Sequence, residues 1–465
     1  MHDKSSNAES ELRTREFLSA MTRSLDITPS FASRVEFAGD GDLASIFAVS
    51  DFAAAAVGTA AAAAGEFIDA TLGVEASVRV SRPLSSLWFG SSLRPIGWTL
   101  PPVWDPIAGN YKAKDGWIRL HTNAPHHRAA ALAVLGVDAD KAAVLKAVAD
   151  WEIEALESAV VEKKGCAAAM RSIAAWARHR QGRSVSREPL IAMLATPDRN
   201  SSELSPTLQR PLAGVRVLDL TRVLAGPVAT RFLAGLGADV LRVDPPDWDE
   251  PGIVPDVTLG KRCTRLDLRH STARAVFEDL LRDADVLVHG YRSDALDKLG
   301  LDAKRRRELR PGLIDVALNA YGWSGPWKTR RGFDSLVQMS AGIAEAGMKT
   351  LGRDGPTPLP VQANDHATGY LMAAAALRAL TERARTGRGS EARVSLARTA
   401  QLLVSGPKRD GLGNLGAPSE EHWSQEIEVT AFGPARRLKS PVAIDDRPLQ
   451  WNRPAARLGS SPPAW

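Results

Sequence analysis

The stretch GVRVLDLTRVLAGPVATRFLAGLGADVLRVD, residues 214–244, decides the fold. A short apolar run at 214–220 leads into a helical run through ATRFLAGLGA, and a second apolar run follows at 239–244. Two strands joined by a helix indicate a βαβ unit, in which the strands are parallel and the helix covers one face of the sheet. The crossover is expected to be right-handed.

The same alternation continues along the second half of the chain. We expect strands at 264–268, 285–290, 312–322 and 392–397, with a helix at 272–284. Strands that alternate with helices are typical of a parallel sheet with helices on its faces. The predicted fold class is therefore α/β: a Rossmann-like parallel sheet with flanking helices, plus a smaller α+β domain.

Composition shifts and turn signals divide the chain into five parts. A hairpin with its turn at Asp115-Gly116 is predicted before alternating helical segments, and TPDRNSSELSPTLQRP, with its prolines and polar residues, is typical of a linker. The predicted parts are a helical N-terminal segment (1–80), a small α+β domain (81–195), a linker (196–211), a Rossmann-like domain (212–405) and an extended C-terminal return segment (406–465).

Charge and composition narrow the class of partner. The 465-residue chain is 44% hydrophobic and 24% charged, with a formal net charge of +5, which favours an anionic ligand. Basic residues are spread among acidic ones, and no stripe of alternating aromatic and basic residues is present. We therefore predict no nucleic-acid partner.

Cysteine usage and the N-terminus favour a cytoplasmic protein. Two cysteines, Cys166 and Cys263, are too few for a disulfide framework or a zinc site, so no metal is predicted. The polar N-terminus lacks the apolar core of a signal peptide. The Ala-rich run at 52–68 is interrupted by Gly58 and Gly65 and is shorter than a membrane span, so it is predicted to be a buried helix, with no membrane association.

A dinucleotide site is the usual expectation for such a sheet, and the sequence argues against it. A nicotinamide or flavin site requires G-x-G-x-x-G directly after the first strand. Here the loop after that strand contains Gly226 followed by Pro227, and no P-loop motif is present. A dinucleotide oxidoreductase is therefore a distant alternative, and neither NAD nor FAD is predicted.

Four further motifs follow residues 214–244 in order: GKRCTRLDLRH, ADVLVHGYRSDALDKLGL, NAYGWSGPWKTRRGFDSLVQMSAG and ANDHATGYLMAAAALRALTERARTGRGSEARVSL. With them, residues 210–400 resemble the class III CoA-transferases, the family of formyl-CoA transferase, carnitine CoA-transferase and α-methylacyl-CoA racemase. The resemblance implies acyl-CoA and a carboxylic acid as substrates. It also implies transfer of CoA through anhydride and thioester intermediates on an aspartate.

The resemblance makes Asp365 the nucleophile, because Thr368 and Gly369 complete the family's D-x-x-[ST]-G pattern. A carboxylate is a suitable covalent nucleophile. Judged from the residues alone, Asp365 is instead an N-cap of the apolar helix that follows, and the two roles are compatible. The positive end of the helix dipole is expected to keep Asp365 ionised. His366 is expected to point away from Asp365 and to be a surface or packing residue.

CoA is a polyanion, so its site needs cations and free backbone N–H groups. The resemblance carries this role to residues in the first loop, in the GKR stretch before the third strand, after the fourth strand, and just ahead of the active-site loop. The positions are Arg222, Ala225, Lys261, Tyr291, Lys298 and Arg331.

The chain departs from the family pattern at three places. His289–Asp294 stand where the family has an acidic-Asn-aromatic-Arg-Pro-Gly run, and Pro245 stands where some members have an Arg. Phe333 occupies the position of the racemase branch's histidine, which favours CoA transfer over racemisation, since a racemase needs a second base. An acyl-CoA racemase and a noncatalytic CoA-ester-binding homologue remain alternatives.

The order of the parts also departs from the family. The region around DGWIRLHTN and the helices after it resemble the family's small domain, yet here they precede the nucleotide-binding half. We infer a rearranged chain. Family members form interlocked dimers, so the resemblance implies a homodimer.

Overall fold

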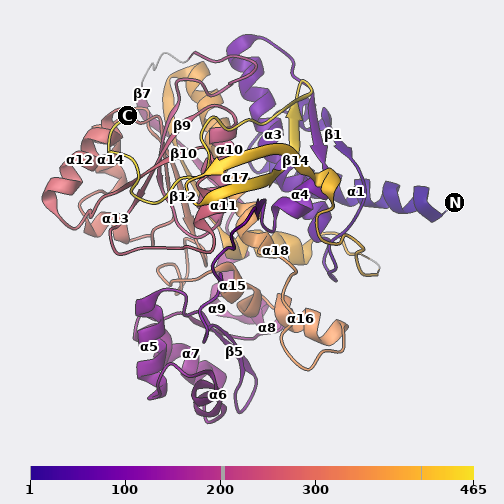
Figure 1. Ribbon diagram of the computed structural model, residues 1–465, viewed down its shortest axis with the longest axis vertical. Helices are drawn as coiled ribbons and strands as arrows, with labels where there is room; N and C mark the ends of the chain where they lie inside the picture. Colours follow the sequence, from indigo (N-terminus) through magenta and orange to yellow (C-terminus); the bar gives the residue numbers. More distant parts are fainter. Residues whose placement is uncertain (1, 200–204, 410) are drawn as a thin grey trace.

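The computed structural model describes residues 2–199, 205–409 and 411–465 and centres on a seven-stranded sheet in the order β10-β9-β8-β11-β12-β13-β7 (Figure 1). Six strands are parallel, and β7 at the edge is antiparallel to β13. The strands are β8 (Arg216–Leu220), β9 (Asp239–Asp244), β10 (Lys261–Arg265), β11 (Val286–His289), β12 (Ile314–Asn319), β13 (Arg388–Ser395) and β7 (Ala192–Arg199). The predicted Rossmann-like sheet is confirmed.

Helices cover both faces of this sheet, because successive strand residues point to opposite sides. Val217 packs in the core that holds α10 (Ala225–Gly235) and α17 (Ala363–Thr386), whereas the next residue, Leu218, packs with α12 (Ser271–Arg282) on the other face. The α/β fold class follows from this two-sided burial.

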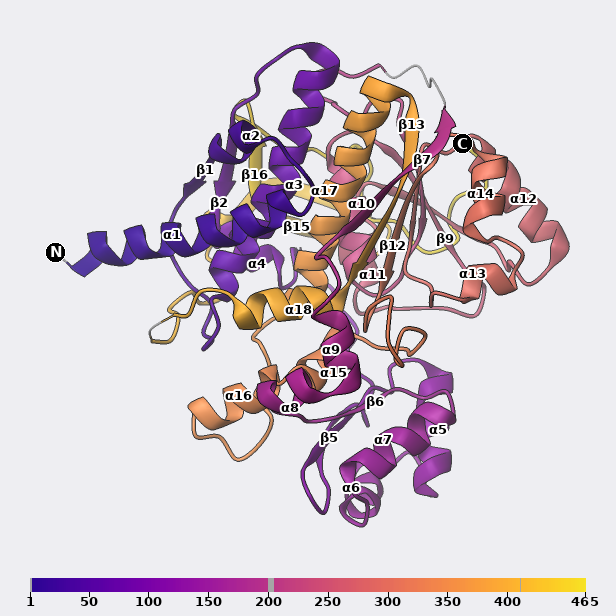
Figure 2. The same cartoon turned by 180° about the vertical axis from the view of Figure 1, so that it is seen from behind.

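A small domain lies at one end of the molecule (Figure 2). Strands β4, β5 and β6 form an antiparallel sheet, and the hairpin predicted at Asp115-Gly116 joins β4 to β5. The elements are β4 (Gly109–Lys112), β5 (Trp117–Leu120), β6 (Ala167–Ala169), α5 (Pro125–Leu135), α6 (Lys141–Ala149) and α7 (Ile153–Glu162). This sheet and its helices occupy only part of the predicted 81–195 segment.

The N-terminal and C-terminal segments fold together, which corrects both predictions for them. Segment 1–80 contains α1 (His2–Arg23) and α3 (Val49–Leu72), but also β1 (Val35–Ala38) and β2 (Val78–Ser81), which pair in parallel. β2 pairs in turn with β16 (Val442–Ile444) of the C-terminal segment, which continues to β17 (Arg447–Pro448). The same segment contributes a hairpin of β14 (Trp423–Thr430) and β15 (Gly433–Leu438), which pairs with β3 (Leu93–Pro95). The return segment is therefore largely strand rather than merely extended.

The predicted linker 196–211 is wrong at its start, since residues 196–199 belong to β7, and its residues 200–204 lie outside the described residues. Pro197 suggested a loop, but an edge strand tolerates proline, and the pairing of β7 with β13 is irregular beside it, where the register shifts between Arg388 and Ser390.

The Ala-rich run is a buried helix, as predicted. Helix α3 is long and apolar enough to cross a membrane by length and composition, yet its whole apolar window is buried against the rest of the chain. Shorter helices complete the fold: α2 (Pro29–Ser33), α4 (Arg82–Trp88), α8 (Ile173–Arg178), α9 (Arg180–Val185), α11 (Val254–Val257), α13 (Ala295–Lys298), α14 (Ala303–Leu309), α15 (Asp334–Ser340), α16 (Ile343–Thr350), α18 (Leu396–Ser405) and the 3-10 turn η1 (Glu420–His422).

At Gly369, helices α17 and α10 approach so closely that there is no room for a Cβ atom. A Cβ added at Gly369 would meet the Ala225 carbonyl oxygen and lie 2.9 Å from Val228 Cβ. We expect Gly369→Ala to lower the free energy of unfolding by about 1–3 kcal/mol, the usual cost of overpacking. Urea denaturation measures it.

Gly65→Ala in α3 is the matched control. A Cβ at Gly65 would have its nearest neighbour at 3.6 Å, an ordinary contact, so alanine should raise stability by up to about 1 kcal/mol through helix propensity. Equal effects from the two substitutions would contradict the close approach at Gly369.

Candidate active site

Two predicted CoA-binding side chains meet where the strand order of the sheet reverses, between β8 and β11. Ligands of such sheets bind at the carboxyl ends of the strands at this point. The Arg222 guanidinium lies 5.2 Å from the Tyr291 ring centroid and 4.8 Å from that of Trp248. The sequence did not single out Trp248, which adds an aromatic face beside the cation.

The loop between β8 and α10 is held in a strained conformation. Val223 has a φ of 63°, which is unusual for a β-branched residue. Its N–H donates to Glu250 Oε1 at 2.7 Å, and the other Glu250 oxygen accepts from Arg242 at 3.0 Å. A buried ion pair beneath the loop therefore fixes its backbone.

The N-terminus of α10 offers free backbone donors. The N–H groups of Ala225 and Gly226 donate to no described residue, and Pro227, next in the first turn, has no N–H. Unpaired N–H groups at a helix N-terminus bind anions. The role of Ala225 in the ligand site stays a prediction, and its backbone N–H is the group that would carry it.

Asp365 stands one helical turn before the residue of α17 that touches this N-terminus. Gly369, one turn further along α17, touches the Ala225 carbonyl, and residues four apart lie on the same face of a helix. The N-cap of α17 is Gln362, so Asp365 is the third residue of the helix and not its cap. The cap interpretation of Asp365 is therefore wrong. The residue is 7% exposed.

Asp334 of α15 adjoins Asp365, and the two carboxyl groups differ in their surroundings. Asp334 accepts hydrogen bonds from Gln338 Nε2 at 2.9 Å, from Asn364 Nδ2 at 2.7 Å and from the Asp365 N–H at 3.0 Å. The Asp365 side chain accepts none from any described residue. Burial raises the pKa of Asp334 and its N–H donors offset part of that rise, whereas the Asp365 carboxyl group has no such donor.

Burial, and then the Asp334 charge, raise the pKa of Asp365 well above its usual value. The dipole that was expected to keep Asp365 ionised is therefore opposed by burial and by the Asp334 charge. A dipole contributes about 0.3–1 kcal/mol at exposed sites, whereas burying a carboxylate without a partner costs several kcal/mol.

Positive side chains from both domains gather at the switch point. Burial, followed by the charge of Arg292, lowers the pKa of Arg331. Burial, followed by the charges of Arg331 and Arg222, lowers the pKa of His126 in the small domain. Such mutual repulsion in the free protein favours a polyanion. The sequence identified Arg222 and Arg331 but not His126 or Arg292, since only the fold brings α5 of the small domain to this place.

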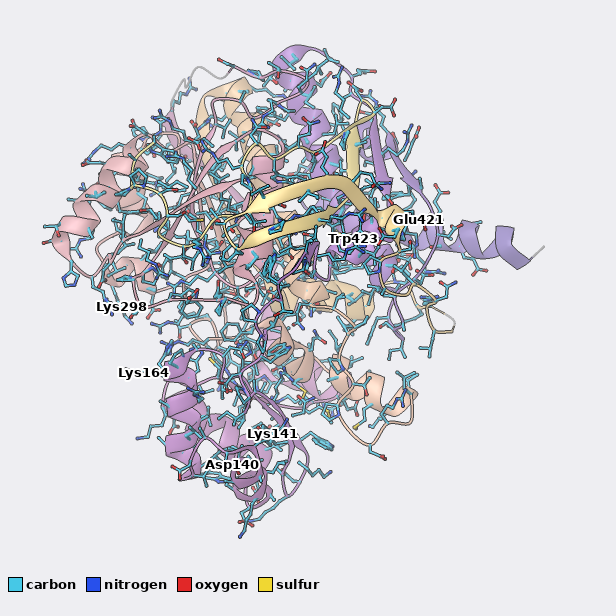
Figure 3. The ribbon with its side chains drawn as sticks, viewed as in Figure 1. Asp140, Lys141, Lys164, Lys298, Glu421 and Trp423 are labelled. Carbon is cyan, nitrogen blue, oxygen red and sulfur yellow. The ribbon has the colours of Figure 1, made fainter. Side chains whose placement is uncertain are left out.

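Two predicted CoA contacts do not fit the structure. The Lys261 side chain is fully buried and pairs with Asp219 at 3.0 Å, so it stabilises the sheet rather than facing a phosphate. Lys298 lies on the surface of α13 and pairs with Asp294 there (Figure 3). Both lysines match family positions, but sequence position does not reveal that each already has a carboxylate partner.

His366 was expected to be a surface or packing residue, and it is a packing residue. It is buried and stacks on Phe89 with ring centroids 5.0 Å apart, and burial lowers its pKa to about 3. Phe333 stacks on His121 of the small domain at 3.8 Å. The racemase position is therefore apolar, but histidines from another domain surround it.

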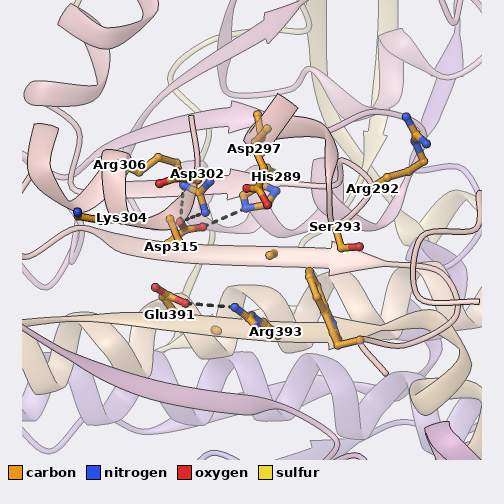
Figure 4. A pocket seen from close by; sticks show the side chains of 15 residues that line it. His289, Arg292, Ser293, Asp297, Asp302, Lys304, Arg306, Asp315, Glu391 and Arg393 are labelled. Atoms are coloured by element: carbon orange, nitrogen blue, oxygen red, sulfur yellow. Dashed lines mark hydrogen bonds and ion pairs between the residues drawn. The ribbon is translucent and has the colours of Figure 1, made fainter. Parts of the chain in front are cut away.

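The departure at His289–Asp294 has a structural consequence (Figure 4). His289 Nε2 lies 3.1 Å from Asp315 Oδ1, and Arg306 Nε donates to the other oxygen at 2.7 Å. Arg292 and His289 line a cavity of about 310 Å³ there, which contains neither Asp334 nor Asp365. Among the residues that the structure describes, no group of three or more His, Cys, Asp or Glu side chains is arranged to hold a metal.

Comparison with known proteins identifies relatives. The sequence profile of CoA-transferase family III matches residues 212–433. The formyl-CoA:oxalate CoA-transferase of Streptomyces avermitilis is 31% identical over 54% of this chain and 72% of its own. The acetyl-coenzyme A transferase nodX of Hypoxylon pulicicidum is 32% identical over 56% of this chain and 41% of its own.

Other relatives match shorter stretches. The succinate–glutarate CoA-transferase of Agrobacterium fabrum is 31% identical over 45% of this chain and 59% of its own. The crystal structure of Rv3272 from Mycobacterium tuberculosis covers 42% of this chain and 55% of its own, with 34% identity and a TM-score of 0.39. The chain spans 41%, 53% and 48% of the length of the first three curated relatives, which is about half.

The raised pKa of Asp365 predicts a pH-dependent stability gain on its removal. A carboxyl group whose pKa is higher in the folded state binds its proton more tightly there, so stability falls as the pH rises from the unfolded pKa, near 4, to the folded one. We expect Asp365→Asn to raise the free energy of unfolding at pH 7 by on the order of 1 kcal/mol or more, since one pKa unit is worth about 1.4 kcal/mol.

The gain should vanish below about pH 4, where Asp365 is protonated in both states. Thermal denaturation of both proteins between pH 4 and pH 8 measures it. The control is Asp279→Asn, whose side chain is 75% exposed and should change stability little at any pH. A pH-independent effect at Asp365 would contradict the raised pKa.

Proposed function

The chain belongs to CoA-transferase family III, and from this premise we propose that it moves CoA from an acyl-CoA donor to a carboxylic acid acceptor, with Asp365 as the nucleophile. The observation that supports it is a buried carboxyl group without a side-chain partner, one helical turn before the point where α17 touches the N-terminus of α10. Arg222 lies in the loop that leads into the same α10.

In the proposed reaction, an Asp365 oxygen attacks the thioester carbonyl, the C–S bond breaks and CoA thiolate leaves, which gives a mixed anhydride. The thiolate then attacks the aspartyl carbonyl and releases the donor acid, so that CoA is held as an aspartyl thioester. An acceptor carboxylate attacks this thioester and expels CoA thiolate. Finally, the thiolate attacks the acceptor side of the new anhydride and frees Asp365. Each step exchanges one acyl bond for another, so no oxidant or metal is required.

The residues of the site suit these steps. Arg222, Arg331 and Arg292 supply charge for the CoA phosphates, and Trp248 and Tyr291 supply aromatic faces. In this proposal the free N–H groups of α10 stabilise the negative charge that develops on the reacting carbonyl oxygen. Three donors fix the Asp334 carboxylate. This carboxylate orients Asp365 by accepting a hydrogen bond from the Asp365 backbone N–H.

Racemisation is less well supported. The histidines near Phe333 are His121 and His127. Burial lowers the pKa of His121 well below its usual value and that of His127 to about 3. An effective general base has a pKa near the working pH, so these imidazoles are poor partners for removing an α-proton. A homodimer and a cytoplasmic location stay predictions from the sequence and the family resemblance.

Covalent trapping tests the proposal. Wild-type protein incubated with a panel of acyl-CoAs should gain the mass of an acyl group or of CoA, and hydroxylamine should remove the adduct. Asp365→Asn should gain nothing, because an amide is not a nucleophile here. Intact-protein mass spectrometry measures both.

Asp279→Asn is the control and should form the adduct as the wild type does. An adduct on Asp365→Asn would assign the chemistry to another residue. Measurable binding of acyl-CoA by the wild type without any adduct would favour the noncatalytic alternative.

A further inference from the structure

We propose that a cavity next to Asp334 binds a second carboxylate on the acyl group, with Arg119 of the small domain as its cation, so that the preferred acids are short dicarboxylic acids. This inference rests on the proposed function for its place in the reaction. The class of ligand is inferred from the cavity itself.

The cavity is lined by both domains and has a volume of about 260 Å³. Gln362 is the N-cap of α17, three residues before Asp365, and Gln338 donates to Asp334. The space therefore adjoins the carboxyl pair. A water molecule's share of liquid volume is about 30 Å³, so the cavity holds the equivalent of about nine waters, which suits an acyl chain of a few carbons.

The chemistry of the lining favours an anion. Its polar side chains are two glutamines, an asparagine, a serine and one arginine, and no carboxylate lines it. The remaining wall is apolar and includes Trp104, whose ring centroid lies 4.7 Å from the Arg119 guanidinium.

Arg119 has N–H donors that no described residue uses. It gives one hydrogen bond to Asn110 at 3.0 Å, its buried Nε has no partner, and no described carboxylate lies within ion-pair distance. Burial lowers its pKa, and the charge of Asp334 partly offsets this. Arg119 is half-buried, and a ligand carboxylate would satisfy its guanidinium, including the buried Nε, in a forked geometry.

The alternative role for Arg119 is to balance the charge of Asp334 through space. That role would affect every substrate equally, whereas recognition of a distal carboxylate affects dicarboxylic acids alone. The two roles are therefore separable by comparing acids of the same length.

The test measures binding of free glutarate and butyrate to the full chain by calorimetry, and kcat/KM for the same acids as acceptors. We expect the wild type to prefer glutarate. Arg119→Gln should weaken glutarate binding and lower kcat/KM for glutarate by about 10–150-fold, the value of a hydrogen bond to a charged group. Both values for butyrate should stay unchanged. Lys146→Gln, an exposed position on the same domain, is the control.

Equal losses for both acids, or no preference in the wild type, would overturn the proposal. The binding measurement is independent of turnover. Glutarate binding that depends on Arg119 in a protein that forms no covalent adduct would uphold this site and refute the proposed transferase reaction.

A second observation carries a separate inference: we infer that segment 49–81 is another copy of the segment 363–395, in which the aspartate is a structural anchor and not a nucleophile. Each position lies 314 residues before its counterpart, without a gap, and identical residues include Asp51 and Asp365, Gly73 and Gly387, and RVS at 79–81 and 393–395. Both helices have 24 residues, and both end at a glycine in the left-handed conformation.

The likeness extends to the elements that follow. The strand after each helix ends in a serine, Ser81 or Ser395, whose side chain caps the next helix by accepting from the N–H three residues on. Each strand pairs in parallel with an earlier one, β2 with β1 and β13 with β12. The two long helices, α3 and α17, pack against each other in the core.

The two aspartates now have opposite surroundings. The Asp51 carboxylate is fully buried and accepts from Arg82 at 2.9 Å, and from Thr14 and Arg13 of α1, each at 3.2 Å. It is therefore an anchor for α1, whereas Asp365 has no side-chain partner. The first copy keeps the helix and the strand around its aspartate, but other side chains bind this carboxylate and it is not free to react.

Peptide mapping of the trapped adduct tests this. We expect one adduct per chain, on the peptide that contains Asp365, and none on the peptide that contains Asp51. Asp51→Asn should lower the melting temperature and keep the adduct on Asp365. An adduct on Asp51 in the wild type or in Asp365→Asn overturns the inference even if Asp51→Asn does not fold, and so does an Asp51→Asn protein of unchanged stability.

Discussion

The burial of α17 is the constraint on which the structure depends. This helix lies between α3, α10 and the strands β12 and β13, so it is buried along nearly its whole length. Alanines and Gly369 allow neighbouring backbones to come close, and the approach at Gly369 sets the N-terminus of α10 beside that of α17. A carboxyl group at the start of a helix packed in this way is deprived of water whatever the rest of the site contains.

Water exclusion then decides the electrostatics. Three N–H donors offset part of the cost of burying Asp334, whereas Asp365 has no such donors and stands beside Asp334. The free protein therefore bears a cost at Asp365, and the cations at the switch point repel one another as well. Binding of a polyanionic thioester directly relieves the repulsion among these cations. Such local conflicts between stability and charge are typical of functional sites.

The sheet was predictable because its strands are short apolar runs separated by helices with a clear period. The candidate nucleophile, Asp365, was singled out by a five-residue pattern. What the sequence could not indicate is pairing between distant segments: β2 bonds to β16, and the edge strand β7 contains a proline. For the same reason Lys261 was misassigned, since its partner Asp219 is 42 residues away in sequence, and Arg119 was missed, since only docking of the small domain places it near Asp334.

The comparison of α3 with α17 separates position from environment. Both helices place an aspartate at the third residue, and both end and continue in the same way. One aspartate is surrounded by two arginines and two hydroxyl groups, and the other by a carboxylate. A carboxylate with four donors is stabilised in its charged form and is a weak nucleophile, because those bonds must be given up when the charge moves into a new bond. A motif thus specifies where the carboxyl group lies, and its neighbours determine whether it can react.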